Sequence, residues 1–64
     1  MIRYYLLDDK NRRTEMFVAY SDIAAEFGTT RNSIAGKFYR AKHQQNSSII
    51  SVNDHLIERV VENN

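Results

Sequence analysis

Residues 21–40 have the sequence SDIAAEFGTTRNSIAGKFYR, and this run limits the possible folds more than any other part of the chain. Gly28 stands between two segments with helical spacing of apolar residues, and Ala24 lies four residues before it, where a small side chain lets two helices cross closely. Ile23, Phe27 and Ile34 supply apolar contacts between these helices. The spacing predicts a helix-turn-helix, and Thr29, in place of the more usual aliphatic residue, is its one departure.

Polar residues at suitable positions predict where both helices begin. Ser21 is expected to cap the first helix, with Asp22 and Glu26 on its early turns. Thr30 is expected to cap the second, because its hydroxyl can accept a hydrogen bond from a free backbone N–H of the next turn. The second helix is then predicted from Arg31 to about His43.

The second helix has an apolar and a polar face. At about 100° per residue, one arc gathers Ile34, Ala35, Phe38 and Ala41. The opposite arc carries Ser33, Gly36, Lys37 and Arg40, flanked by Asn32 and His43. An amide can bond adenine, cations suit guanine or phosphate, and a hydroxyl suits either role. The polar face therefore predicts double-stranded DNA as the partner, with this helix in the major groove.

Gly36 is unusual in the middle of that face. Glycine destabilises a helix interior by about 1 kcal/mol relative to alanine. Close approach of the backbone to the floor of a DNA groove is one compensation, and close packing against another part of the same protein is the other.

Charge is segregated although the formal net charge is only +1, which argues against a generic polycation. The only charged residues from Thr29 to Ser48 are Arg31, Lys37, Arg40 and Lys42. A second basic cluster comprises Lys10, Arg12 and Arg13. This pattern favours a directed phosphate-binding surface, and a solvated basic face without a ligand is the alternative.

Length and composition exclude several classes of protein. The 64 residues allow one small domain, 1–64, which buries only about 60% of its unfolded surface. There is no cysteine, and His43 and His55 lack zinc-binding spacing. Without a cofactor motif or a phosphate loop, we expect no enzymatic activity, no metal and no cofactor. Without a signal peptide or spanning segment, we expect a cytoplasmic or nucleoid-associated location in a bacterial host cell and no membrane.

The segments on either side of the helices are expected to form strands. Residues 2–7, IRYYLL, and 14–20, TEMFVAY, predict a hairpin over 2–20, with Ile2, Tyr4 and Leu6 on one face. Its tip carries Lys10, Arg12 and Arg13, either as a wing that reaches phosphates or as an ordinary solvated turn.

Residues 48–61 fit either of two structures. A helix would begin at Ser51, and a hairpin would turn at Asn53 and Asp54. The many β-branched residues favour the hairpin. The expected fold class is therefore α+β, with an N-terminal β-hairpin, a central helix-turn-helix over 21–43 and C-terminal strands, or alternatively a C-terminal helix.

Residues 22–40 resemble the DNA-binding helices of the GcrA cell-cycle regulator family. The family pattern is an IAA-x-x-G half followed by a TRN-x-x-x-GK-x-x-R half, here Ile23, Ala24, Ala25, Gly28, Thr30, Arg31, Asn32, Gly36, Lys37 and Arg40. The resemblance implies that Arg31, Asn32, Lys37 and Arg40 bind in the major groove, with Thr30 near the backbone. The overall layout is also similar to small phage helix-turn-helix proteins and to the DNA-binding repeats of intron-encoded endonucleases.

These observations together predict sequence-preferring binding of double-stranded DNA by a small phage or mobile-element transcription regulator. Specific binding is expected to need a homodimer, joined through the edge of the C-terminal hairpin, with half-sites about 34 Å apart. The main alternative is a protein-interaction module that binds a host protein such as RNA polymerase. RNA binding is a third possibility, in which Tyr4, Tyr5, Phe17 and Tyr39 would stack on bases if exposed.

Overall fold

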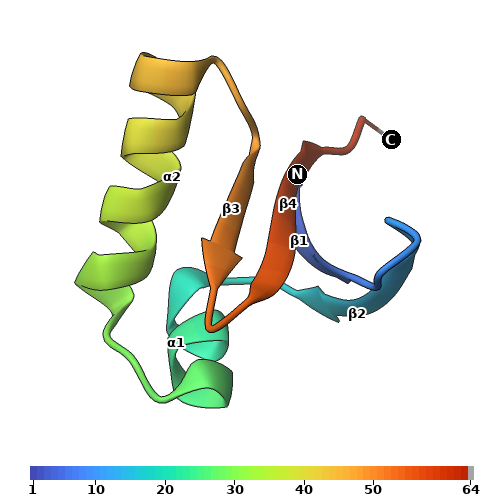
Figure 1. Ribbon diagram of the computed structural model, residues 1–64, viewed down its shortest axis with the longest axis horizontal. Coiled ribbons are helices and arrows are strands. Elements are labelled where there is room, and N and C mark those ends of the chain that lie inside the picture. The colour runs from blue at the N-terminus through green and yellow to red at the C-terminus, as the bar shows by residue number, and fades with distance from the viewer. Residues whose placement is uncertain (64) are drawn as a thin grey trace.

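Two helices pack on one face of a four-stranded antiparallel sheet (Figure 1). The computed structural model describes residues 1–63. The elements are β1 (Ile2–Leu7), β2 (Arg13–Phe17), α1 (Tyr20–Phe27), α2 (Arg31–Gln45), β3 (Ile49–Val52) and β4 (His55–Val61), and the strand order is β2-β1-β4-β3. The predicted α+β fold, with an N-terminal hairpin, a central helix pair and C-terminal strands, is confirmed.

The centre of the sheet joins the two ends of the sequence. β1 pairs with β4 along its whole length, from Ile2 opposite Val61 to Leu7 opposite Leu56. Each hairpin therefore contributes one central strand, and β2 and β3 become the edges. Because side chains alternate along a strand, the register also decides which residues of β1 and β4 share the face that the helices cover.

The core lies between that face and the helices. Ile23 of α1, Ile34 of α2 and Ile57 of β4 are fully buried. The other buried residues of this cluster are Tyr4, Phe17, Ala24, Phe38, Ala41, Ile50 and Val52. Tyr4 and Phe17 are thus part of the core, which removes them as stacking platforms for RNA bases.

The C-terminal hairpin turns at Asn53 and Asp54, as the strand interpretation predicts. Both residues adopt left-handed backbone conformations, with φ of 48° and 67°. Asparagine and aspartate tolerate this conformation, and two such residues in succession make the tight turn that suits twisted strands. The Asn53 side-chain amide also donates a hydrogen bond of 3.0 Å to the Phe27 carbonyl, which ties this turn to the end of α1. The alternative C-terminal helix does not form.

The start of α1 differs from the prediction. The helix begins at Tyr20, its N-cap is Ala19, and no side chain caps it, so the prediction that Ser21 caps it is wrong. The Tyr20 ring packs 5.1 Å from the ring of Tyr4 and 5.6 Å from the ring of Phe38. This packing draws Tyr20 into the helix, so the strand predicted to reach residue 20 ends at Phe17.

The turn and the start of α2 follow the prediction closely. Gly28 ends α1 with φ of 64°, a left-handed conformation that favours glycine. Thr30 caps α2, since its hydroxyl accepts a hydrogen bond of 3.1 Å from the Ser33 N–H. The helix runs beyond His43 to Gln45 and ends at Asn46, which is also left-handed, with φ of 48°. Neither helix within residues 1–63 has the length and apolar character needed to cross a membrane.

Candidate nucleic-acid interface

The buried face of α2 fixes which of its residues point to solvent. Ile34, Phe38 and Ala41 are buried against the sheet and α1. At 100° per residue, the opposite side of the helix carries Asn32, Gly36, Tyr39, Arg40 and His43. Tyr39 is 66% exposed, and its ring centre lies 4.3 Å from that of His43. We call these five residues the outward face of α2.

Basic residues lie on both flanks of the outward face. Arg31 lies on the flank next to α1, with its guanidinium 5.8 Å from the centre of the Tyr20 ring. Lys42 follows on the same flank. Lys37 lies on the other flank, where a groove of about 400 Å³ separates α2 from β3. Ser33 is half-buried, and its N–H is engaged with the Thr30 cap.

The basic residues of α2 have no acidic partners among residues 1–63. The ion pairs within residues 1–63 join Arg3 to Glu62, Arg12 to Asp8 and Arg13 to Glu58. α2 itself contains no aspartate or glutamate, so Arg31, Lys37, Arg40 and Lys42 keep uncompensated charge. A helix that presents only positive charge offers an anionic ligand a surface free of competing carboxylates.

Within residues 1–63, the side-chain atoms nearest to Gly36 belong to its own helix. A Cβ built on Gly36 meets first the Arg40 side chain, with Nη1 at 3.1 Å, and the next nearest atoms belong to the same guanidinium. The interpretation that Gly36 makes room for another part of the protein is therefore wrong for residues 1–63. Among the described residues, a flexible side chain of the same helix, Arg40, is what lies nearest to the backbone at Gly36.

The structure separates Arg12 and Arg13 from the residues predicted on α2. The tip of the β1–β2 hairpin lies at the opposite side of the molecule from α2 (Figure 1). Arg13 Nε lies 3.2 Å from a Glu58 carboxylate oxygen and its guanidinium covers the Tyr5 ring at 4.8 Å, on the sheet face turned away from the helices. A single surface centred on α2 thus includes Thr30 and the residues of α2, and leaves out the hairpin tip, so Arg12 and Arg13 do not lie together with the other predicted site residues.

Asp8 organises that tip as a self-contained turn. One of its carboxylate oxygens accepts hydrogen bonds from the backbone N–H groups of Lys10, at 2.9 Å, and Arg12, at 2.8 Å. The other accepts from Arg12 Nε at 2.9 Å. The bond from the Arg12 N–H is the main reason that the pKa of Asp8 falls below its ordinary value of 3.8. The Arg12 guanidinium thus forms an ion pair with Asp8 that stabilises the turn.

Within residues 1–63, no three His, Asp or Glu side chains lie close enough together to hold a metal ion. No family model, curated protein or solved structure matches the chain. The resemblance to the GcrA family stays a prediction.

Sequence reasoning missed Arg59, the residue of β4 that the register places opposite Tyr4 on the helix-covered face. Arg59 lines a cavity beside α2 together with Lys42 and Tyr20. One signal in the sequence marks it, because Arg59 shares a strand face with the core residue Ile57. A charged residue at such a position needs an opening to solvent or a partner. The pairing of Tyr4 with Arg59 joins residues near opposite ends of the sequence, so no short sequence pattern predicts it.

Proposed function

We propose that the protein binds double-stranded DNA, with α2 lying in the major groove. The observation that carries this proposal is the segregation of chemistry on α2. Hydrogen-bonding side chains occupy its outward face, unpaired cations occupy both flanks, and acids are absent from the helix. The major groove, about 12 Å wide, admits an α-helix.

The residues of α2 divide into two roles in this arrangement. Asn32 and Arg40, on the outward face, can each form paired hydrogen bonds to a base edge, adenine for the amide and guanine for the guanidinium. Arg31 and Lys37, on opposite flanks, suit the phosphates of the two strands that border the groove, as does the exposed Thr30 at the start of the helix. This division supports sequence preference as well as affinity.

Gly36 supports the same placement. Its Cα lies on the outward face between Asn32 and Arg40, so a groove-bound α2 brings the Gly36 backbone close to the base edges. In the part of the chain that the structure describes, the atoms nearest to a Cβ at Gly36 belong to Arg40 of the same helix. Close approach to DNA would therefore compensate for the conformational cost of this glycine.

A homodimer through β3 completes the proposal. The Arg59 N–H bonds the Ser48 carbonyl, and with the β3–β4 register this turns the backbone groups of Ile49 and Ser51 toward the outer edge of β3. Those of Ile49 bond the Ser47 hydroxyl, so the N–H and C=O of Ser51 are the groups left for a partner strand. Two copies could pair these edges and present two α2 helices to neighbouring half-sites. Such a dimer fits a small transcription regulator of phage or mobile-element origin acting on the DNA of a bacterial host.

Isotope-labelled protein titrated with a random-sequence duplex tests the proposal residue by residue. Backbone amide resonances of α2 residues, Asn32 and Arg40 above all, are expected to shift, and those of Tyr5 and Arg13 on the far face of the sheet are expected to stay. Shifts concentrated on the far face would contradict the placement of α2 in the groove.

A protein partner is the second candidate function, and the free edge of β3 is what favours it. The groove between α2 and β3 places Ser51, whose backbone groups face the outer edge of β3, beside Lys37 and Arg40. An extended acidic segment of a host protein, such as RNA polymerase, could add to β3 as a further strand with its carboxylates on these cations. Shifts confined to β3 and Lys37 on adding an acidic peptide, with none on adding duplex, would favour this function.

A further inference from the structure

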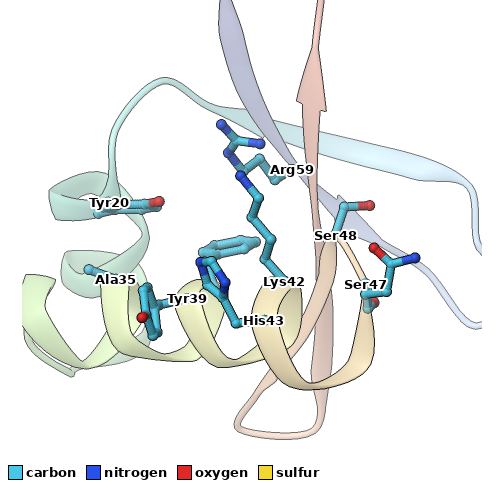
Figure 2. A pocket seen from close by; sticks show the side chains of 10 residues that line it. Tyr20, Ala35, Tyr39, Lys42, His43, Ser47, Ser48 and Arg59 are labelled. Carbon is cyan, nitrogen blue, oxygen red and sulfur yellow. The ribbon is translucent and has the colours of Figure 1, made fainter.

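A cavity of about 530 Å³ lies on the α1 side of α2, apart from the groove beside β3. Its walls come from α1, α2, β4 and the connection after α2, and Figure 2 shows side chains from each of these elements around it. Tyr20, Tyr39 and Phe38 supply aromatic surface. Lys42 and Arg59 supply positive charge, from elements remote in the sequence.

The charge inside this cavity is uncompensated. None of its lining residues is acidic, and neither Lys42 nor Arg59 forms an ion pair within residues 1–63. Arg59 is half-buried, and it lies close enough to Tyr4 to oppose the rise in the pKa of that phenol, which burial causes in the main. Two cations that share a partly enclosed space repel each other, and an anion between them removes that repulsion.

The donors around the cavity match a phosphate group. Arginine offers a planar fork of N–H donors, and lysine adds a mobile point charge. The Ser47 hydroxyl is already engaged with the backbone of Ile49, as acceptor at 3.1 Å and as donor at 3.4 Å. The Ser48 hydroxyl makes no hydrogen bond within residues 1–63, so it remains as a third donor at the cavity wall.

We propose that Lys42 and Arg59 bind a phosphate group in this cavity. Tyr39 and His43 belong both to the cavity lining and to the outward face of α2, so a strand bordering the groove-bound helix passes the cavity mouth. The phosphate is then a phosphodiester of the DNA backbone, an assignment of its source that rests on the proposed function. A free phosphorylated molecule has the same chemistry and is distinguished by experiment.

The first arm of the test uses inorganic phosphate alone. Isotope-labelled protein is titrated with phosphate at constant ionic strength, and the backbone amide resonances of Ser47, Ser48 and residue 59, which every variant retains, are followed. We expect a saturable shift in the wild type and in Lys10→Gln, which removes the same charge at the remote hairpin tip. We expect loss of binding in Lys42→Gln and in Arg59→Gln, and circular dichroism shows whether each variant is folded. Arg59→Lys retains the charge and gives a second folded variant with weakened binding.

The second arm measures duplex affinity against salt concentration. Loss of one phosphate contact lowers the slope of log K against log salt by about 1, so Arg59→Gln is expected to have the smaller slope and Lys10→Gln the wild-type slope. A wild type that binds duplex, combined with an unchanged slope in Arg59→Gln and no response to phosphate, would overturn the phosphate site and leave DNA binding standing. A wild type that ignores duplex but responds to phosphate through Arg59 would overturn the proposed function and assign the site to a free phosphorylated molecule.

Discussion

Substituting the two glycines by alanine separates the stability of the fold from its function. Gly36 lies inside α2, where alanine is favoured over glycine by about 1 kcal/mol. The new Cβ meets first the Arg40 guanidinium, which can move into solvent. Gly36→Ala is therefore expected to raise the free energy of unfolding by about 1 kcal/mol, which corresponds to about 4–8 °C in Tm for a domain of this size.

Gly28→Ala is the matched control with the opposite sign. A Cβ at Gly28 meets nothing within 4 Å, so space does not limit the substitution. The φ of 64° is left-handed, however, and a residue with a Cβ destabilises the fold there by about 1–2 kcal/mol. Urea unfolding followed by circular dichroism measures both changes, and a Gly36→Ala variant less stable than the wild type would contradict the reasoning about its surroundings.

Gly36→Ala is expected to weaken binding to DNA although it stabilises the fold. If the Gly36 backbone approaches the groove floor, an added methyl group overpacks the interface by about 1–3 kcal/mol. That corresponds to about a 5- to 150-fold rise in Kd, measured by fluorescence anisotropy on a duplex selected by the wild type. Folded Gly28→Ala should keep wild-type affinity. A Gly36→Ala protein that is more stable and binds equally well would refute the placement of Gly36 at the groove floor.

Three further substitutions test the cap, the turn and the sheet edge. Thr30→Ala removes the bond to the Ser33 N–H and should lower the free energy of unfolding by about 0.5–2 kcal/mol in urea titrations, with Thr30→Ser restoring it. Folding lowers the pKa of Asp8 below its ordinary value of 3.8. The ionised Asp8 carboxylate therefore stabilises the fold fully above pH 3.8, and this stabilisation is lost as the pH falls through the lower pKa of the folded protein. Asp8→Ala should therefore be less stable than the wild type at neutral pH, with the difference vanishing in acid, and a difference that persists in acid would contradict this. Ser51→Pro removes an edge N–H without breaking a β3–β4 bond, so sedimentation should show a weakened dimer with the fold intact, and an unchanged dimer would exclude the β3 edge.

The elements that the sequence predicted well are those with local chemistry. Gly28 and Thr30 mark the turn and the start of α2 through their own backbone and hydroxyl. Asn53 and Asp54 likewise form a tight turn from their own tolerance of left-handed backbone. These features need no knowledge of the rest of the chain, so the helix pair and both hairpins could be predicted.

The features that the sequence did not predict depend on contacts between distant residues. Tyr20 joins α1, in place of a Ser21 cap, because its ring packs on Tyr4 and Phe38. The position of Arg12 follows from the strand order, which puts the hairpin tip at the far side of the sheet from α2. Arg59 reaches the cavity beside α2 through the register of β4 on β1.

Contact of α2 with the phosphates and bases of DNA can be tested by a salt series of duplex binding. The wild type is compared with Lys37→Gln and Arg40→Gln on α2 and with Lys10→Gln at the hairpin tip, each of which removes one positive charge. Binding to random-sequence duplex should fall steeply with salt, with a slope of about 0.9 for each phosphate neutralised. We expect weaker binding in both α2 variants and wild-type binding in Lys10→Gln. Equal losses in all three, or no duplex binding at low salt by folded wild type, would contradict it.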